Sequence, residues 1–354
     1  MKIATLGNAA AVHTQRWVEW FRGRGHEVEV WSLERGPVEL RAHALPRTPF
    51  PGALRYPLAV PALRRELAVF GPDLVDAHYV PNYGLAAALA ARRPLVVSAW
   101  GSDLLVDPRR DPLRRARARF VLARADHVLA DSDNLAAAAL ALGAERERAS
   151  ASPWGVDASR FKPAGGRESG LVISTRMHEP IYDLPTVLRA VARAHRALPA
   201  LHLAIAGDGS QHRELEAQAR RELPEGAWQM LGLLDRDALA GWLARAEIYV
   251  AAARSDSTSV SLLEAMACGA IPIVTDLEGN RQWVAEGDGG RLFPPGDDVR
   301  LAAAIEQTLA RPDWCEAARL RNRQVVGTRA NAAINMPRIE ALFERLVRQG
   351  GRNV

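Results

Sequence analysis

Short apolar runs alternate with amphipathic stretches along the first half of the chain. The runs predict strands, and the stretches, with apolar residues every three or four positions, predict helices. The predicted strands are Met1–Leu6, Glu27–Ser32, Leu74–Ala77, Leu95–Ser98 and His127–Ala130, and the predicted helices are Thr14–Arg24, Pro61–Phe70, Asn82–Ala91, Pro112–Arg124 and Asn134–Leu142. Strands separated by helix-length segments indicate βαβ units and a parallel sheet.

The same alternation returns in the second half. The predicted strands there are Leu171–Ser174, Leu201–Ala206, Gln229–Leu231, Glu247–Ala251 and Ile271–Thr275, and the predicted helices are Thr186–Ala197, Ser210–Glu222, Arg236–Ala244 and Ser257–Cys268. A Gly- and Pro-rich stretch, 153–166, separates the halves and predicts a domain boundary near Pro163. The sequence therefore predicts an α/β protein with two doubly wound, Rossmann-like domains. A ligand would bind in a cleft at the carboxyl ends of both sheets.

Size and composition agree with two soluble domains. The chain has 354 residues, of which 48% are hydrophobic, enough for two separate cores. Two cysteines, Cys268 and Cys315, argue against a disulfide framework and favour a reducing, cytoplasmic location. No Cys/His cluster has the spacing of a zinc site, and no segment reads as a signal peptide or a membrane span.

Charge is unevenly distributed. The net charge is +5, and residues 1–163 carry 23 basic against 17 acidic side chains. Much of the surplus lies in the arginines between Arg109 and Arg124. This cluster fits an anionic membrane surface, a nucleic acid or a solvated helix face. We expect no nucleic-acid partner, because the sequence contains no known nucleic-acid-binding motif.

The segment 247–275 carries the most chemical information. A predicted strand leads into the polar loop 254–258, and a predicted helix ending at Gly269 follows it. The amino end of a helix is a site for phosphate, because its free N–H groups and dipole attract anions. Asp256 lies at that end and Glu264 follows eight residues later. The pair fits a phosphate-ligand site in which one carboxylate contacts a sugar hydroxyl and the other a ribose. It equally fits an ordinary capping Asp and a surface Glu.

Three other positions follow predicted strands. Arg176 could pair with phosphate, Gly207-Asp208-Gly209 allows a close approach of backbone to ligand, and His78 could titrate or donate a hydrogen bond. Each of these signals is weak by itself.

Taken together, these residues resemble retaining glycosyltransferases of family 4, which have the GT-B fold. Asp256-x7-Glu264 followed by Ala265-Met266-Ala267-Cys268-Gly269 is similar to the family's E-x7-E motif, and further matches are Arg24-Gly25-His26-Glu27-Val28, Trp154-Gly155-Val156-Asp157, Gly207-Asp208-Gly209 and Asp297. The resemblance covers almost the whole chain. It implies an acceptor-binding domain over 1–163, a donor-binding domain over 164–335, and a C-terminal helix over 336–354 that crosses back to the first domain.

The resemblance also implies roles for individual residues. Asp256 would contact the transferred sugar, Arg176 the diphosphate, and His78 the far side of the sugar, while Glu264 would bind the donor ribose. The other residues implied on the donor side are Gly207, Asp208, Gly209, Leu231, Leu233, Ser257, Thr258, Ser259, Val260, Tyr182 and Asn280, and those on the acceptor side are Asn8, His13, Trp100 and Asp103.

The chain departs from the family pattern at several points. The first acid of the motif is Asp256 instead of Glu, and Tyr182 stands where a Lys often follows the Arg. The N-terminal loop, from Gly7 to His13, lacks the common Gly-Gly pair, and the frequent His-Gly-x-Asp is Trp100-Gly101-Ser102-Asp103.

The expected reaction is transfer of a sugar from a nucleotide diphosphate to a glycan, lipid-linked or small-molecule acceptor, with retention and with neither metal nor cofactor. Cationic and dipolar groups would stabilise the leaving phosphate. Asp131-Ser132-Asp133 matches the Asp-x-Asp pattern of metal-binding motifs, but its position after a predicted strand and before a predicted helix indicates a helix cap. A nucleotide-sugar epimerase or a phosphorylase on the same fold is the enzymatic alternative, and a basic nucleic-acid-binding protein is the non-enzymatic one. If the acceptor is lipid-linked, the basic first domain would lie on the inner face of the membrane.

Overall fold

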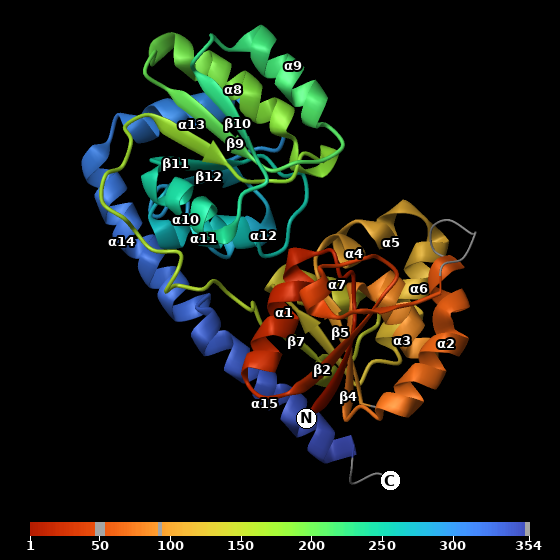
Figure 1. Cartoon of the computed structure of the whole chain (residues 1–354). Coiled ribbons are helices and arrows are strands. Elements are labelled where there is room, and N and C mark those ends of the chain that lie inside the picture. Colours follow the sequence, from red (N-terminus) through yellow and green to blue (C-terminus); the bar gives the residue numbers. More distant parts are fainter. Residues whose placement is uncertain (47–53, 91–93, 351–354) are drawn as a thin grey trace. The chain divides into compact units, whose positions relative to one another are not determined.

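The computed structural model describes residues 1–46, 54–90 and 94–350, which divide into two compact units (Figure 1). The first unit comprises Met1–Pro153 and the chain from Pro337 onward, and the second is Trp154–Met336. The first division falls earlier than the boundary expected at Pro163. The reason is that Val156 already pairs with Asn331, and its N–H donates to the carbonyl of Ala330 at 2.7 Å. The Gly- and Pro-rich stretch is therefore anchored to the second unit.

The first unit is built on a seven-stranded parallel sheet with the order β3-β2-β1-β4-β5-β6-β7. Its elements are β1 (Lys2–Leu6), α1 (Val12–Gly23), β2 (Glu27–Ser32), a 3₁₀ turn (Val38–Leu40), β3 (His43–Ala44), α2 (Arg55–Phe70), β4 (Leu74–His78), a π-helix (Tyr79–Gly84), α3 (Leu85–Ala90), β5 (Leu95–Ala99), α4 (Ser102–Leu105), α5 (Asp107–Arg110), α6 (Pro112–Leu122), β6 (His127–Ala130), α7 (Asp133–Ala141), a 3₁₀ turn (Arg146–Arg148) and β7 (Ala149–Ala151).

The C-terminal helix α15 (Ala332–Gly350) supplies, from Pro337 onward, the last part of the first unit. Phe343 stacks on Phe21 of α1 with ring centroids 5.2 Å apart. Glu340 accepts from His26 at 2.7 Å and pairs with Arg24 at 3.3 Å. The Arg24-Gly25-His26 turn is therefore a docking point for α15, and Gly25 holds the left-handed conformation that follows a helix end.

The second unit is built on a six-stranded parallel sheet with the order β10-β9-β8-β11-β12-β13. Its elements are β8 (Leu171–Ser174), a 3₁₀ turn (Pro180–Tyr182), α8 (Leu184–Ala197), β9 (His202–Ala206), α9 (His212–Glu222), β10 (Trp228–Gly232), α10 (Arg236–Arg245), β11 (Ile248–Ala251), α11 (Val260–Cys268), β12 (Ile271–Thr275), α12 (Glu278–Arg281), β13 (Arg291–Phe293), α13 (Asp298–Leu309) and α14 (Pro312–Arg329).

Helices cover both faces of this second sheet. One apolar core joins the sheet to α8, α9 and α13, and the other joins it to α10, α11 and α14 (Figure 1). The central strands are buried along their whole length, which explains their continuous apolar sequence. Two doubly wound parallel sheets confirm the predicted fold class.

All ten predicted strands are present, with ends shifted by one residue at most. The short edge strands β3, β7 and β13 were not predicted. Helix α2 begins at Arg55 and runs through Pro61, which was predicted to start it. The predicted helix Asn82–Ala91 is divided between the π-helix and α3, and its last residue, Ala91, lies outside the described residues.

Candidate active site

The strand order of the second sheet reverses between β8 and β11. The strands that follow β8 in the chain, β9 and β10, are added on one side, and those that follow β11, β12 and β13, are added on the other. In open α/β sheets, ligands bind at the carboxyl ends of the strands at such a switch point. Arg176 follows β8 and Asp256 follows β11, so the topology brings both predicted catalytic residues of this unit to one place.

The guanidinium of Arg176 is the centre of this site. It is 8% exposed, and its Nη2 donates to Oδ2 of Asp256 at 2.9 Å. Its Nη1 donates to the hydroxyls of Ser259 and, at 3.1 Å, Ser261. Burial is the largest single influence on the pKa of Arg176 and lowers it, but the Asp256 carboxylate, Tyr249 and Tyr182 together raise it more, so its pKa lies above its usual value. Arg176 is therefore a fixed positive charge.

The aromatic ring of Tyr182 packs against the guanidinium of Arg176. The carbon of the guanidinium lies 4.1 Å from the centre of its ring, which is a cation–π contact. The Lys expected at this position would repel Arg176, whereas the tyrosine ring fixes its plane. Nε of Arg176 is buried and has no hydrogen-bond partner among the described residues.

Helix α11 begins at Val260, with Ser259 as its cap, whereas the sequence predicted a start at Ser257. The Ser259 hydroxyl accepts the N–H of Leu262 at 3.3 Å, which fixes the first turn at this point. Asp256 consequently lies in the loop before the cap and not at the helix start. Ser257, Thr258 and Ser259 are all buried, so the predicted donor loop is an ordered part of the site.

Glu264 lies inside α11 and is 4% exposed, which excludes the alternative of a surface glutamate. Burial, followed by the charge of Glu264, raises the pKa of the Cys268 thiol to about 12, so that cysteine stays protonated. A buried carboxylate one turn into a helix that starts beside Arg176 is placed for recognition of a polar ligand group.

Gly279 and Asn280, both in α12, support the site. Gly279 packs against the loop that carries Asp256 and Ser257. A Cβ on Gly279 would lie 2.2 Å from the carbonyl oxygen of Ser257, so only glycine allows this approach. The amide of Asn280 donates to the carbonyl of Thr275 at 2.8 Å. Asn280 is 2% exposed, and this bond gives it a bracing role at the end of β12.

The Gly207–Gly209 loop packs directly against the segment that carries Arg176. Gly207 has φ 132°, and a Cβ there would lie 2.6 Å from the carbonyl oxygen of Arg176. The carbonyl of Asp208 accepts the N–H of His178 at 2.9 Å. Leu231 and Leu233 lie at the end of neighbouring β10, half-buried and exposed respectively. The loop therefore sets the position of the Arg176 backbone.

The first unit gathers its predicted residues at its own switch point, between β1 and β4. His78 is the last residue of β4 and is buried. Its Nε2 lies 3.0 Å from Oδ2 of Asp76, and Oδ1 of Asp76 accepts the Ser98 hydroxyl at 2.8 Å. Because Asp76 is fully buried, this bond fixes the orientation of the imidazole.

Aromatic rings surround His78. The ring centroid of Trp100 lies 5.0 Å from that of His78, and His13 stacks on Trp100 with centroids 5.6 Å apart. Asn8 is exposed on the loop after β1, and its side chain accepts the N–H of Ala10 at 2.9 Å. The predicted acceptor residues Asn8, His13 and Trp100 are therefore grouped around the carboxyl ends of β1, β4 and β5.

Asp103 departs from its predicted place on the acceptor side. It is fully buried, and its carboxylate accepts N–H groups from Val80 at 3.1 Å and Gly101 at 2.9 Å. Burial raises the pKa of Asp103 to about 6, against the lowering effect of these backbone bonds. Asp103 therefore positions the Trp100 loop and does not present its carboxylate to a ligand.

Sequence reasoning missed several partners of the site residues. Asp76 and His78 alternate in one strand and so share a face, a signal that was available in the sequence. Ser261 and Tyr249 gave no such signal. Their hydroxyls are 2.8 Å apart, and they meet Arg176 only because α11 lies against β11.

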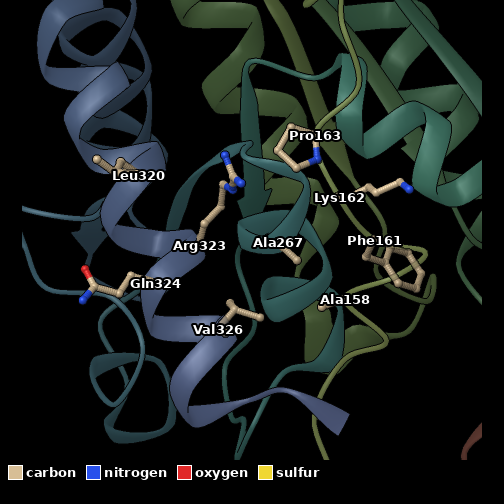
Figure 2. A pocket seen from close by; sticks show the side chains of 10 residues that line it. Ala158, Phe161, Lys162, Pro163, Ala267, Leu320, Arg323, Gln324 and Val326 are labelled. Carbon is tan, nitrogen blue, oxygen red and sulfur yellow. The ribbon is translucent and has the colours of Figure 1, made fainter. Parts of the chain in front are cut away.

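A separate cavity of about 500 Å³ lies in the second unit between α14 and the segment 158–163 (Figure 2). Ala267, near the carboxyl end of α11, lines one side of it, and Leu320 and Arg323 on α14 line the other. No predicted donor residue contributes to its wall, so this cavity is distinct from the Arg176 site. The predicted cleft between the two domains stays a prediction.

Two protein-family models match the chain. Residues 10–160 match the model described as Glycosyltransferase Family 4, and residues 168–311 match that described as Glycosyl transferases group 1. The chain belongs to glycosyltransferase family 4. Phosphatidyl-myo-inositol mannosyltransferase of Mycolicibacterium smegmatis is 28% identical over 83% of this chain and 79% of its own. This glycosyltransferase has, among its described residues, no helix long and apolar enough to cross a membrane.

Solved structures resemble the family 4 chain over nearly its whole length. Sucrose-phosphate synthase from Thermosynechococcus elongatus has a TM-score of 0.85 at 18% identity, covering 98% of this chain and 99% of the synthase. Anabaena Alr3699/HepE in complex with UDP-glucose has a TM-score of 0.82 at 20% identity, covering 97% and 99%. At these identities the similarity establishes the GT-B fold.

Proposed function

We propose that this glycosyltransferase moves a sugar from a UDP- or GDP-linked donor to a glycan, lipid-linked or small-molecule acceptor, with retention of configuration and with no metal on the diphosphate. The reaction would serve cell-envelope or exopolysaccharide synthesis. The main support is one arrangement: a buried Arg176 joined to the amino end of α11 at the switch point of the second sheet. HepE, which shares the fold, is complexed with UDP-glucose.

The donor diphosphate would bind where Arg176 meets the first turn of α11. The free N–H groups and the dipole of that turn attract a pyrophosphate. As the bond to the sugar breaks, negative charge grows on the leaving phosphate, and Arg176 would stabilise this charge. This charge stabilisation needs no divalent ion.

The two acids of the motif would act on opposite ends of the donor. Glu264, buried in α11, would accept hydrogen bonds from the ribose, and Asp256 would contact the sugar beside Arg176. The acceptor hydroxyl would attack from the face of the leaving group, which preserves the configuration. His78, held by Asp76, would contribute from the first unit.

The decisive experiment combines two conservative variants with two matched controls. Arg176→Lys keeps the charge but loses the planar fork that bonds Asp256 and Ser259, and Glu264→Gln removes one charge. Arg189→Lys and Glu216→Gln make the same changes on the surface of α8 and α9, where these residues pair with Asp298 and Arg220.

A thermal-shift screen of UDP, GDP and ADP with their sugars first identifies the donor, because a ligand of the native state raises the melting temperature. We expect both site variants to lower kcat/KM by about 10²–10³-fold, the loss typical of one charge-stabilising contact. The two controls should match the wild type. Full turnover in both site variants would contradict the proposal, and donor turnover without acceptor would favour the epimerase alternative.

Exposed arginines support a membrane-facing acceptor side. Arg109, Arg110, Arg115 and Arg119 are exposed on α5 and α6, and Leu113 beside them is 69% exposed. A basic face with an exposed apolar residue is typical of segments that lie on anionic bilayers. This arrangement fits a lipid-linked acceptor and a location at the cytoplasmic face of the membrane.

A further inference from the structure

Three metal-ligating side chains meet on the loops beside the candidate donor site. They are His178, on the loop after β8, and Asp208 and His212, around the loop between β9 and α9. One ligand atom from each lies within 4.8 Å of the other two. The proposed transfer reaction assigns no role to either histidine, so this cluster requires its own explanation.

The two imidazoles approach each other through their Nδ1 atoms, which are 2.9 Å apart. Nδ1 of His212 lies 3.6 Å from Oδ1 of Asp208. Two nitrogens bound to one Zn²⁺ at about 2.0–2.1 Å are about 3.3 Å apart in a tetrahedral site. The observed separations lie on either side of that value, so a small rotation of the rings places all three atoms around one ion.

Backbone hydrogen bonds hold the ligands in place before any ion binds. The N–H of His178 donates to the carbonyl of Asp208 at 2.9 Å, and the N–H of Gln211 donates to the carbonyl of His178 at 2.9 Å. The Asp208 carboxylate is oriented by the N–H of Gly209 at 2.7 Å. A preorganised ligand set of this kind lowers the entropic cost of binding a metal.

Burial differs among the three side chains. His178 is fully buried, and it would bind an ion through Nδ1, the atom that faces His212. His212 and Asp208 are partly exposed, with side-chain exposures of 31% and 57%. The cluster is therefore closed on the protein side and open to solvent on the other, which gives an ion both an entry path and a position for water.

We propose that His178, Asp208 and His212 form a binding site for a transition-metal ion of the Zn²⁺ class. Two imidazole nitrogens and one carboxylate oxygen favour Zn²⁺, Co²⁺ or Ni²⁺ over Mg²⁺ and Ca²⁺, which prefer oxygen ligands. The ion would tie the His178 loop to the Gly207–Gly209 loop. Asp208 is also among the residues implied on the donor side, but zinc binding needs no nucleotide, so the proposal can hold or fail apart from the transfer reaction.

The test measures metal binding to the full chain, treated with a chelator and then dialysed, in the absence of nucleotide. Calorimetric titration with ZnCl₂ and the visible absorption of bound Co²⁺ are recorded for the wild type, His212→Asn and His195→Asn. His195 is a matched control, because its Nδ1 bonds the carbonyl of Leu201 on another part of the unit. Circular dichroism verifies that each variant is folded.

We expect one equivalent of Zn²⁺ in the wild type and in His195→Asn, with MgCl₂ giving no comparable heat. In His212→Asn the affinity should fall at least about 10–100-fold, the loss that changes around a metal site typically cause. Asp208→Asn should also weaken binding. Equal Zn²⁺ affinity in His212→Asn, or no stoichiometric binding in the wild type, would overturn the proposal and leave an ordinary N–H···N hydrogen bond between the rings.

Discussion

The substitution Gly207→Ala tests how the glycine loop positions Arg176. Gly207 has φ 132°, a region that residues with a side chain rarely adopt. An added Cβ would lie 2.6 Å from the carbonyl oxygen of Arg176 and 3.4 Å from a ring carbon of His178. The closest of these atoms belongs to the backbone, so the Arg176 segment itself has to move.

The expected magnitude combines two costs. A residue with a side chain in such a backbone region costs about 1–3 kcal/mol, and a forced contact in a packed region costs about 1–3 kcal/mol more. We therefore expect the free energy of unfolding to fall by roughly 2–6 kcal/mol. A displacement of Arg176 by about 1 Å should lower kcat/KM by about 10²-fold.

Gly226→Ala is the matched control. Gly226 also has a positive φ, 83°, but a Cβ there meets no atom within 4 Å. It should lose only about 1–2 kcal/mol of stability and keep its activity. Urea unfolding and donor kinetics, at a temperature where both variants are folded, compare the two. If Gly207→Ala were as stable and as active as Gly226→Ala, the role assigned to this loop would be refuted.

Three further predictions address other parts of the molecule. Tyr182→Leu should weaken donor binding by about 0.5–2 kcal/mol in calorimetry, because it removes the ring under Arg176, whereas Tyr182→Phe should keep it. Burial, and then Arg345, lowers the pKa of His127 to about 4, so only the unfolded chain gains this proton between about pH 6.5 and 4. Unfolding titrations should show about 3 kcal/mol of stability lost across that range, and a smaller loss in His127→Gln. Arg115→Glu with Arg119→Glu should abolish sedimentation with anionic vesicles, while the same charge change at Arg64 and Arg65 should not.

The fold could be predicted because its strands are continuous apolar runs separated by amphipathic helices. The edge strand His43–Ala44 has only two residues and is exposed, so no apolar run marks it. Helix α2 was predicted too short, because Pro61 was read as a start although the helix accommodates it. The domain boundary depended on the pairing of Val156 with Asn331, a contact between distant segments that local patterns do not encode.

The residues of the candidate site were found by motif, but their contacts were not. The sequence indicated Arg176, Asp256 and Glu264, yet not that Arg176 bonds Ser259, the cap of α11, and Ser261 in its first turn. Asp103 looked like a ligand-binding acid because it ends a recognisable motif, while its burial became visible only in the fold. The His178–His212 contact joins residues 34 positions apart, and no local spacing announced it.

The most direct test of the donor site is a crystal structure of the full chain with the nucleoside diphosphate selected by thermal shift. The diphosphate oxygens are expected within hydrogen-bond distance of Arg176 and of the first-turn N–H groups of α11, with the ribose hydroxyls at Glu264. A nucleotide bound elsewhere, for example in the cavity lined by Ala267 and Arg323 (Figure 2), would contradict the account.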